Sequence, residues 1–83
     1  MARVHEDGGF SIYVYSPPRE HEPPHVHAEH REGGEVLIFL GDDETPPSLW
    51  RNHHMAPVQA RAALRIVEKH QARFLEEWSR LHD

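Results

Sequence analysis

With 83 residues, of which 37% are hydrophobic, the chain has room for one domain with a single modest core. It contains no cysteine, so disulfide bridges and thiolate zinc sites are excluded, and a bound metal would need histidine and carboxylate ligands. The net charge of −5 disfavours non-specific nucleic-acid binding, although nine histidines make this charge sensitive to pH.

Three strands are predicted between about residues 10 and 41. Phe10–Tyr15 is rich in aromatic and β-branched residues, and in His25–His30 the small apolar residues Val26 and Ala28 point toward the core. Glu35–Leu40 ends in an unbroken apolar run, so we expect it to be covered on both faces or to lie at a subunit contact. A glycine turn joins the last two strands, which predicts an antiparallel meander.

Residues 42–56 are predicted to form a loop, in which Leu49–Met55 is irregular or half a turn of helix. Pro57 then opens a long helix that runs to about His82, because the fixed φ of proline suits a first helical turn. Apolar residues recur along it at alternating four- and three-residue steps, and Gln71 alone interrupts this seam, which consists of Ala60, Leu64, Val67, Phe74, Trp78 and Leu81.

We therefore predict an α+β fold in which residues 1–83 form a single domain. A three-stranded antiparallel β-meander packs against one long C-terminal α-helix. That helix would be about 39 Å long at about 1.5 Å per residue, whereas a domain of this size has a radius of gyration of about 12 Å. Either the helix kinks at Lys69-His70-Gln71, or a dimer buries its far end.

The predicted fold leaves apolar surface uncovered, and this predicts association with a second chain. One helix covers only one face of a sheet, so a homodimer or a small protein partner should cover the rest. We expect Phe39, Phe74 or Trp78 at that contact. No apolar run is long enough for a signal peptide or a membrane span, so we expect a cytoplasmic protein without a membrane partner.

Paired histidines follow a proline pair in the segment Pro23-Pro24-His25-Val26-His27. On a strand His25 and His27 project from one face, with Glu29 next in line. Neutral imidazoles at this spacing can bind a divalent transition metal such as zinc or nickel, with His21 or Glu29, or a second chain, supplying a third ligand.

Two alternatives use the same pair of residues. In a small endoribonuclease, His25 and His27 would act as general base and acid, while Arg31 or the arginine stripe holds the phosphate. The arginine stripe is a row of cationic residues that recur every four positions on the predicted helix, namely Arg61, Arg65, Lys69 and Arg73. In a purely structural reading, both histidine rings only form hydrogen bonds with the backbone. His53 and His54, adjacent in the predicted loop, receive no role.

The order of these elements resembles that of the small bacterial and archaeal proteins of the family called domain of unknown function 4160. The resemblance lies in the aromatic strand Phe10–Tyr15, the Pro-Pro-His-x-His segment at 23–27, the aliphatic strand Val36–Leu40 and the motif Phe74-Leu75-Glu76-Glu77-Trp78. The loop 42–54 departs from the family pattern, being longer and richer in proline and histidine.

The resemblance implies no assigned activity. Members often resemble one half of a two-gene pair, which implies a toxin–antitoxin type of interaction. We therefore predict an interaction module with a histidine site at His25 and His27, with the endoribonuclease as the alternative. RNA is disfavoured as a partner by the net charge of −5.

Overall fold

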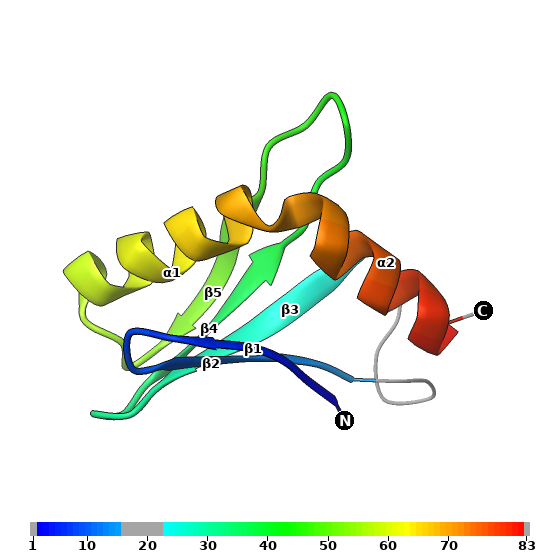
Figure 1. The fold of residues 1–83 in the computed structure, drawn as a ribbon. Helices are drawn as coiled ribbons and strands as arrows, with labels where there is room; N and C mark the ends of the chain where they lie inside the picture. The colour runs from blue at the N-terminus through cyan, green and yellow to red at the C-terminus, as the bar shows by residue number, and fades with distance from the viewer. Residues whose placement is uncertain (1, 16–22, 83) are drawn as a thin grey trace.

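A computed structural model describes residues 2–15 and 23–82 (Figure 1). Its elements, in chain order, are β1 (Ala2–Asp7), β2 (Phe10–Val14), β3 (His25–His30), β4 (Glu35–Phe39), β5 (Ser48–His53), α1 (Pro57–Lys69) and α2 (Gln71–His82). The strands form one five-stranded sheet in the order β1-β2-β3-β4-β5, and every neighbouring pair is antiparallel. The α+β class is confirmed. The three-stranded meander with one long helix is wrong.

The two strands that the sequence did not predict are the edges of the sheet. The segment Ala2–Asp7 is mostly polar, and every residue of Ser48–His53 is exposed, so neither shows the alternation of a half-buried strand. They form because the outer edges of β2 and β4 offer unpaired backbone groups. The prediction that Leu49–Met55 is irregular or half-helical is therefore wrong, because most of it belongs to β5.

The C-terminal helix is interrupted at His70, within the segment where the sequence predicts a kink. His70 has φ −115° and ψ 20°, outside the helical region, and its N–H reaches the carbonyl oxygens of Ile66 and Val67. A straight helix over residues 57–82 would measure about 39 Å at about 1.5 Å per residue. The longest extent of the molecule is 33 Å, so the interruption lets the helical layer follow the sheet.

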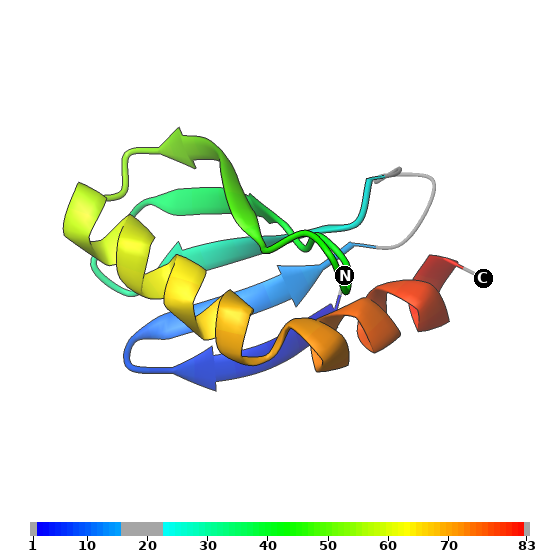
Figure 2. The same cartoon turned by 90° about the horizontal axis from the view of Figure 1, so that it is seen from above.

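Both helices lie on one side of the sheet, as the view from above shows (Figure 2). The core between the two layers is built from alternate residues of β2, β3 and β4 and from the buried side of the helices. Val26 and Ala28 have no exposed surface, which confirms the predicted register of β3. The helical contributions are Ala60, Ala63, Val67, Phe74 and Trp78.

Gln71, the polar interruption of the apolar seam, anchors the loop that projects between β4 and β5. Its Nε2 lies 2.7 Å from the carbonyl oxygen of Leu40, 3.0 Å from that of Asp42 and 3.1 Å from that of Thr45. A leucine at this position would leave these carbonyl groups without that donor. Among the described residues, no helix has the length and apolar character needed to cross a membrane.

Candidate functional site

The face of the sheet turned away from the helices carries the predicted histidine motif. In the β3–β4 register, Val26 pairs with Ile38 and both are buried under the helices, so the neighbouring pairs point to the opposite face. His25 pairs with Phe39, and His27 pairs with Leu37. No described helix covers this open face (Figures 1 and 2).

His25 and His27 lie side by side, with ring centroids 5.5 Å apart. His25 donates a hydrogen bond from Nδ1 to the carbonyl oxygen of Pro23 at 2.9 Å, because a carbonyl can only accept. His27 donates from Nδ1 to Oε2 of Glu35 at 3.3 Å. In each neutral ring Nε2 is therefore the acceptor nitrogen.

The two rings differ in their exposure. His25 is 2% exposed and lies between two tryptophans, each with a ring centroid 5.1 Å from its own. Trp50 comes from β5, and Trp78 comes from α2. His27 remains half-buried. The first histidine of the motif is therefore packed into the protein, and the second faces outward.

Five rings on β3, β4, β5 and the end of β2 contact one another in sequence, and we call this row the aromatic strip. Tyr15 meets His27 edge to face at 4.5 Å, and His27 is followed by His25 and then Trp50. Trp50 stacks on Phe39 with centroids 4.7 Å apart and planes at 15°. The strip therefore crosses the open face as one continuous row of rings, in which His25 is buried and the other four rings are at least partly exposed.

Trp50 is the residue of this strip that the sequence did not single out. The β4–β5 register shifts between Leu37 and Ile38, so that Trp50 is the extra residue of a bulge. A bulge turns a side chain out of the regular alternation. Trp50 is 39% exposed, and the Arg51 guanidinium lies 5.3 Å from its ring centroid. The signal in the sequence is a Leu49-Trp50 pair in an otherwise polar segment, because large apolar residues in a loop need a surface to pack against.

Of the two proposed third ligands, only Glu29 lies among the described residues, and it does not complete a metal site with the pair. Glu29 is exposed further along β3, and His21 lies outside the described residues. Across residues 2–15 and 23–82, no three histidine or carboxylate side chains are arranged to hold a metal ion. Arg31 follows the far end of β3, about 20 Å from His25 at about 3.3 Å per residue, where its N–H donates to the carbonyl oxygen of Gly9.

The remaining candidates lie away from the strip. Phe74 is 0% and Trp78 2% exposed, so both belong to the core and are unavailable for the predicted partner contact. The arginine stripe is exposed on the helical layer, on the side opposite the open face. His53 is the last residue of β5 and His54 follows it with φ 69°, and both are exposed.

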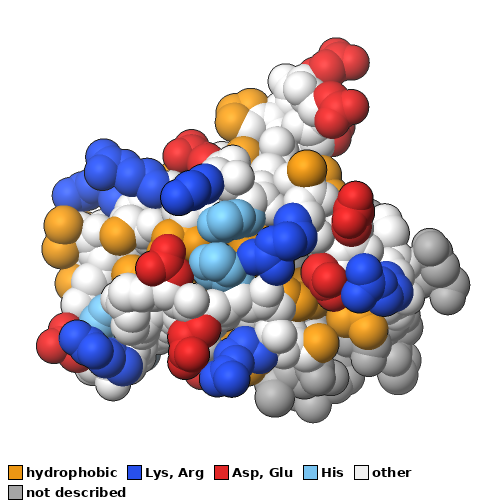
Figure 3. Space-filling model, viewed as in Figure 1, with side chains coloured by type: hydrophobic (Ala, Val, Ile, Leu, Met, Phe, Trp, Pro, Cys, Tyr) orange, Lys and Arg blue, Asp and Glu red, His pale blue; other side chains and the backbone are white. Residues whose placement is uncertain are grey.

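An acidic loop and a groove border one end of the strip. The groove has a volume of about 320 Å³ and is lined by Phe39 together with Pro23, Pro24, Gly41, Asp42, Thr45, Pro46 and Ser48. Acidic side chains cap the projecting loop above it (Figure 3). The pKa of Asp42 is lowered, chiefly by a hydrogen bond from the backbone N–H of Glu44, so this carboxylate stays charged.

Comparison with protein families matches residues 9–79 to the family described as "Domain of unknown function (DUF4160)". No curated protein and no solved structure matches the chain. The matched segment contains every residue of the aromatic strip, whereas β1 precedes it.

Proposed function

The chain belongs to the DUF4160 family, and from this premise we propose that it is an interaction module that binds a small protein partner through the aromatic strip. The observation that carries the proposal is the stacked pair of Phe39 and Trp50 on a face that no described element covers. Tryptophan is enriched among the residues that contribute most of the binding energy at the centre of protein interfaces. Single exposed apolar residues need no such explanation, but a continuous row of five rings does.

The sheet face is a better binding surface than either sheet edge. Both edge strands carry a register shift, between Arg3 and His5 in β1 and opposite Leu37 and Ile38 in β5. Bulges of this kind twist an edge away from further strand pairing. Addition of a partner strand to either edge is therefore disfavoured. Packing of side chains on the open face is left as the mode of binding.

The charge of the chain favours a basic partner. The net charge is −5, and the acidic residues Asp42, Asp43 and Glu44 stand next to the groove at one end of the strip. Two copies of the same chain would repel each other, whereas a basic protein would be steered toward this end. An apolar side chain of the partner fits the groove beside Phe39. The two-gene arrangement implied by the family resemblance makes the product of the adjacent gene the first partner to test.

The test is a calorimetric titration of the chain with the purified product of the adjacent gene. We expect a one-to-one complex, and Trp50→Ala should weaken it by about 30-fold or more, as truncation of a central tryptophan of an interface does. Val58→Ala is the matched control, because Val58 is 65% exposed but lies on α1. This control should bind as the unchanged chain does.

Three results would overturn the proposal. The first is a complex that Trp50→Ala leaves intact. The second is no complex at micromolar concentration, together with sedimentation as a monomer. A dimer of the chain that Trp50→Ala dissociates would identify a second copy as the occupant of the strip, and would refute the basic partner.

Metal binding is our second proposal for the same histidines. It is supported by the hydrogen bonds of both Nδ1 atoms to oxygen, because ligating histidines usually donate their other N–H in this way. Zinc or nickel should bind at neutral pH and be released at about pH 5, since only the neutral ring is a ligand. Calorimetry with tag-free protein should show that changing His25 and His27 together to alanine removes this binding. Equal affinity in the double variant would refute the site.

The endoribonuclease is less well supported. The phosphate-binding candidate Arg31 and the arginine stripe both lie away from His27, at the far end of β3 and on the helical layer respectively. A general acid and base need the phosphate group held within hydrogen-bond reach of both.

A further inference from the structure

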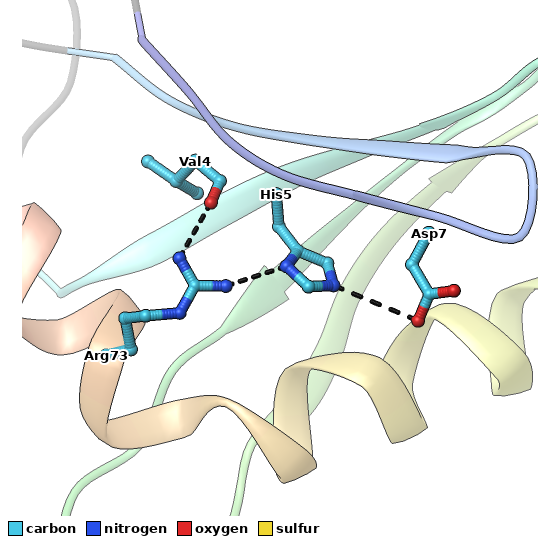
Figure 4. Close-up of polar contacts among 4 residues, drawn as sticks. All are labelled: Val4, His5, Asp7 and Arg73. Carbon is cyan, nitrogen blue, oxygen red and sulfur yellow. Dashed lines mark hydrogen bonds and ion pairs between the residues drawn. The ribbon is translucent and has the colours of Figure 1, made fainter.

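Arg73 of the helical layer forms hydrogen bonds with the edge strand β1. Arg73 of α2 donates from Nη1 to the carbonyl oxygen of Val4 at 2.8 Å and from Nη2 to Nδ1 of His5 at 2.7 Å (Figure 4). Val4 is the bulged residue of β1, without a partner in the β1–β2 register. Arg73 thus binds the strand at the point where its own ladder is interrupted.

The second of these hydrogen bonds requires a neutral imidazole. A guanidinium has only donors, so Nδ1 of His5 must accept and cannot carry a proton. Protonation of His5 would remove this acceptor and place a second cation beside Arg73. On the other side of the ring, Nε2 lies 3.8 Å from Oδ2 of Asp7, whose side chain is 58% exposed (Figure 4). Solvent screens that attraction, so it offsets the repulsion only in part.

A second histidine meets the first at the interruption between the helices. The ring of His70 lies 4.5 Å from that of His5, and both contact the buried ring of Phe74. The groups that face this pair are Arg73 from α2, Lys69 from α1 and Asp7 from β1. The histidine pair is therefore faced by two permanent positive charges, those of Arg73 and Lys69, and by one exposed carboxylate, that of Asp7. Histidine side chains are visible between basic and acidic groups on this side of the molecule (Figure 3).

We propose that His5, His70 and Arg73 form an acid-sensitive latch, which holds β1 against α2 at neutral pH and releases it when the histidines are protonated. Only the hydrogen bond from Arg73 to the carbonyl oxygen of Val4 would then remain, and the positive charge on the protonated rings would repel the guanidinium. The latch is independent of the proposed function, because it lies on the helical side of β1 and not on the aromatic strip.

The direction of the pH effect follows from His70. Burial chiefly lowers the pKa of His70 below its ordinary value of 6.5, and the charges of His5, Arg73 and Lys69 act in the same direction. The folded protein therefore prefers the neutral ring. The stabilisation from this preference is complete above pH 6.5 and is lost as the pH falls through the lowered pKa of the folded state.

Hydrogen exchange measured by mass spectrometry tests the latch on the intact chain. Protection factors of the β1 amides should fall by about tenfold between about pH 7.5 and pH 5, because protonation of the rings favours release of the strand. Those of β3 should change little. In the double variant His5→Gln and His70→Gln, the neutral amide oxygen can still accept from Arg73, so the fall should shrink to about twofold or less.

His53→Gln is the matched control, because His53 is exposed on β5 at the other edge of the sheet. It should retain the full pH response of β1. An unchanged response in the double variant would overturn the latch, as would equal protection of β1 at both pH values. If the double variant does not fold, NMR titration of the His70 imidazole in the unchanged chain decides: a pKa of His70 at or above 6.5 would refute the proposal.

Discussion

Replacing Trp78 with alanine is expected to lower the free energy of unfolding by about 3–5 kcal/mol, the usual cost of truncating a fully buried aromatic side chain. Trp78 is 2% exposed and packs α2 against the start of β3. Its ring stacks on His82 with centroids 3.6 Å apart, and it contacts His25 at the start of β3. Alanine would leave a cavity between α2 and the end of the sheet, and small domains have only about 5–15 kcal/mol of stability in total.

Urea unfolding followed by circular dichroism measures this loss. The control is Trp50→Ala, which removes the same side chain from an exposed position, and there we expect a loss of about 1 kcal/mol or less. The pair of variants separates the two tryptophans by role, since Trp78 should affect stability and Trp50 should affect binding. Similar losses in both variants would show that Trp50 is part of the core and would weaken the argument for the aromatic strip.

Gly41→Ala is expected to destabilise the chain by about 2–4 kcal/mol, as the sum of a left-handed backbone and an overpacked contact. Gly41 has φ 68°, and an added Cβ would overlap the carbonyl oxygen of Thr45 and lie 2.9 Å from that of Pro46. Both are backbone atoms, so neither can rotate away. The loop would have to open, which would also disturb the contacts of Gln71 with the carbonyl oxygens of Asp42 and Thr45.

The matched control for this variant is Gly8→Ala. Gly8 has φ 56°, but no heavy atom lies within 4 Å of the position of an added Cβ. It should therefore show only the backbone cost of about 1–2 kcal/mol. Chemical denaturation of both variants gives the difference directly. Equal losses would mean that the loop between β4 and β5 adapts freely, and that the groove beside Phe39 has no fixed shape.

The central part of the fold could be predicted because its residues carry strong local signals. Val26 and Ala28 alternate with polar neighbours, Pro57 marks the first turn of α1, and the apolar seam identifies the buried side of the helices. The interruption at His70 could also be located, since a straight helix would be longer than the domain. Each of these signals lies within one helix or strand and depends on the backbone geometry of that element alone.

The edge strands could not be predicted in this way. Ala2–Asp7 and Ser48–His53 are strands because β2 and β4 pair with them, and pairing is a property of the partner as much as of the segment. The predicted loop hid Trp50 for the same reason. Without β5 there is no bulge to place that ring against Phe39.

The chemistry of the site depended on neighbours that are distant in the sequence. The spacing of His25 and His27 correctly placed both on one face of a strand, yet their environments differ because Trp78 and Trp50 enclose only the first. The hydrogen bond between Arg73 and His5 joins residues 68 positions apart. Periodicity determines which side of a helix or strand a residue occupies, and the sequence alone is enough to predict this. Burial and hydrogen bonding depend on which other elements come to that side, and only the assembled sheet and helices establish them.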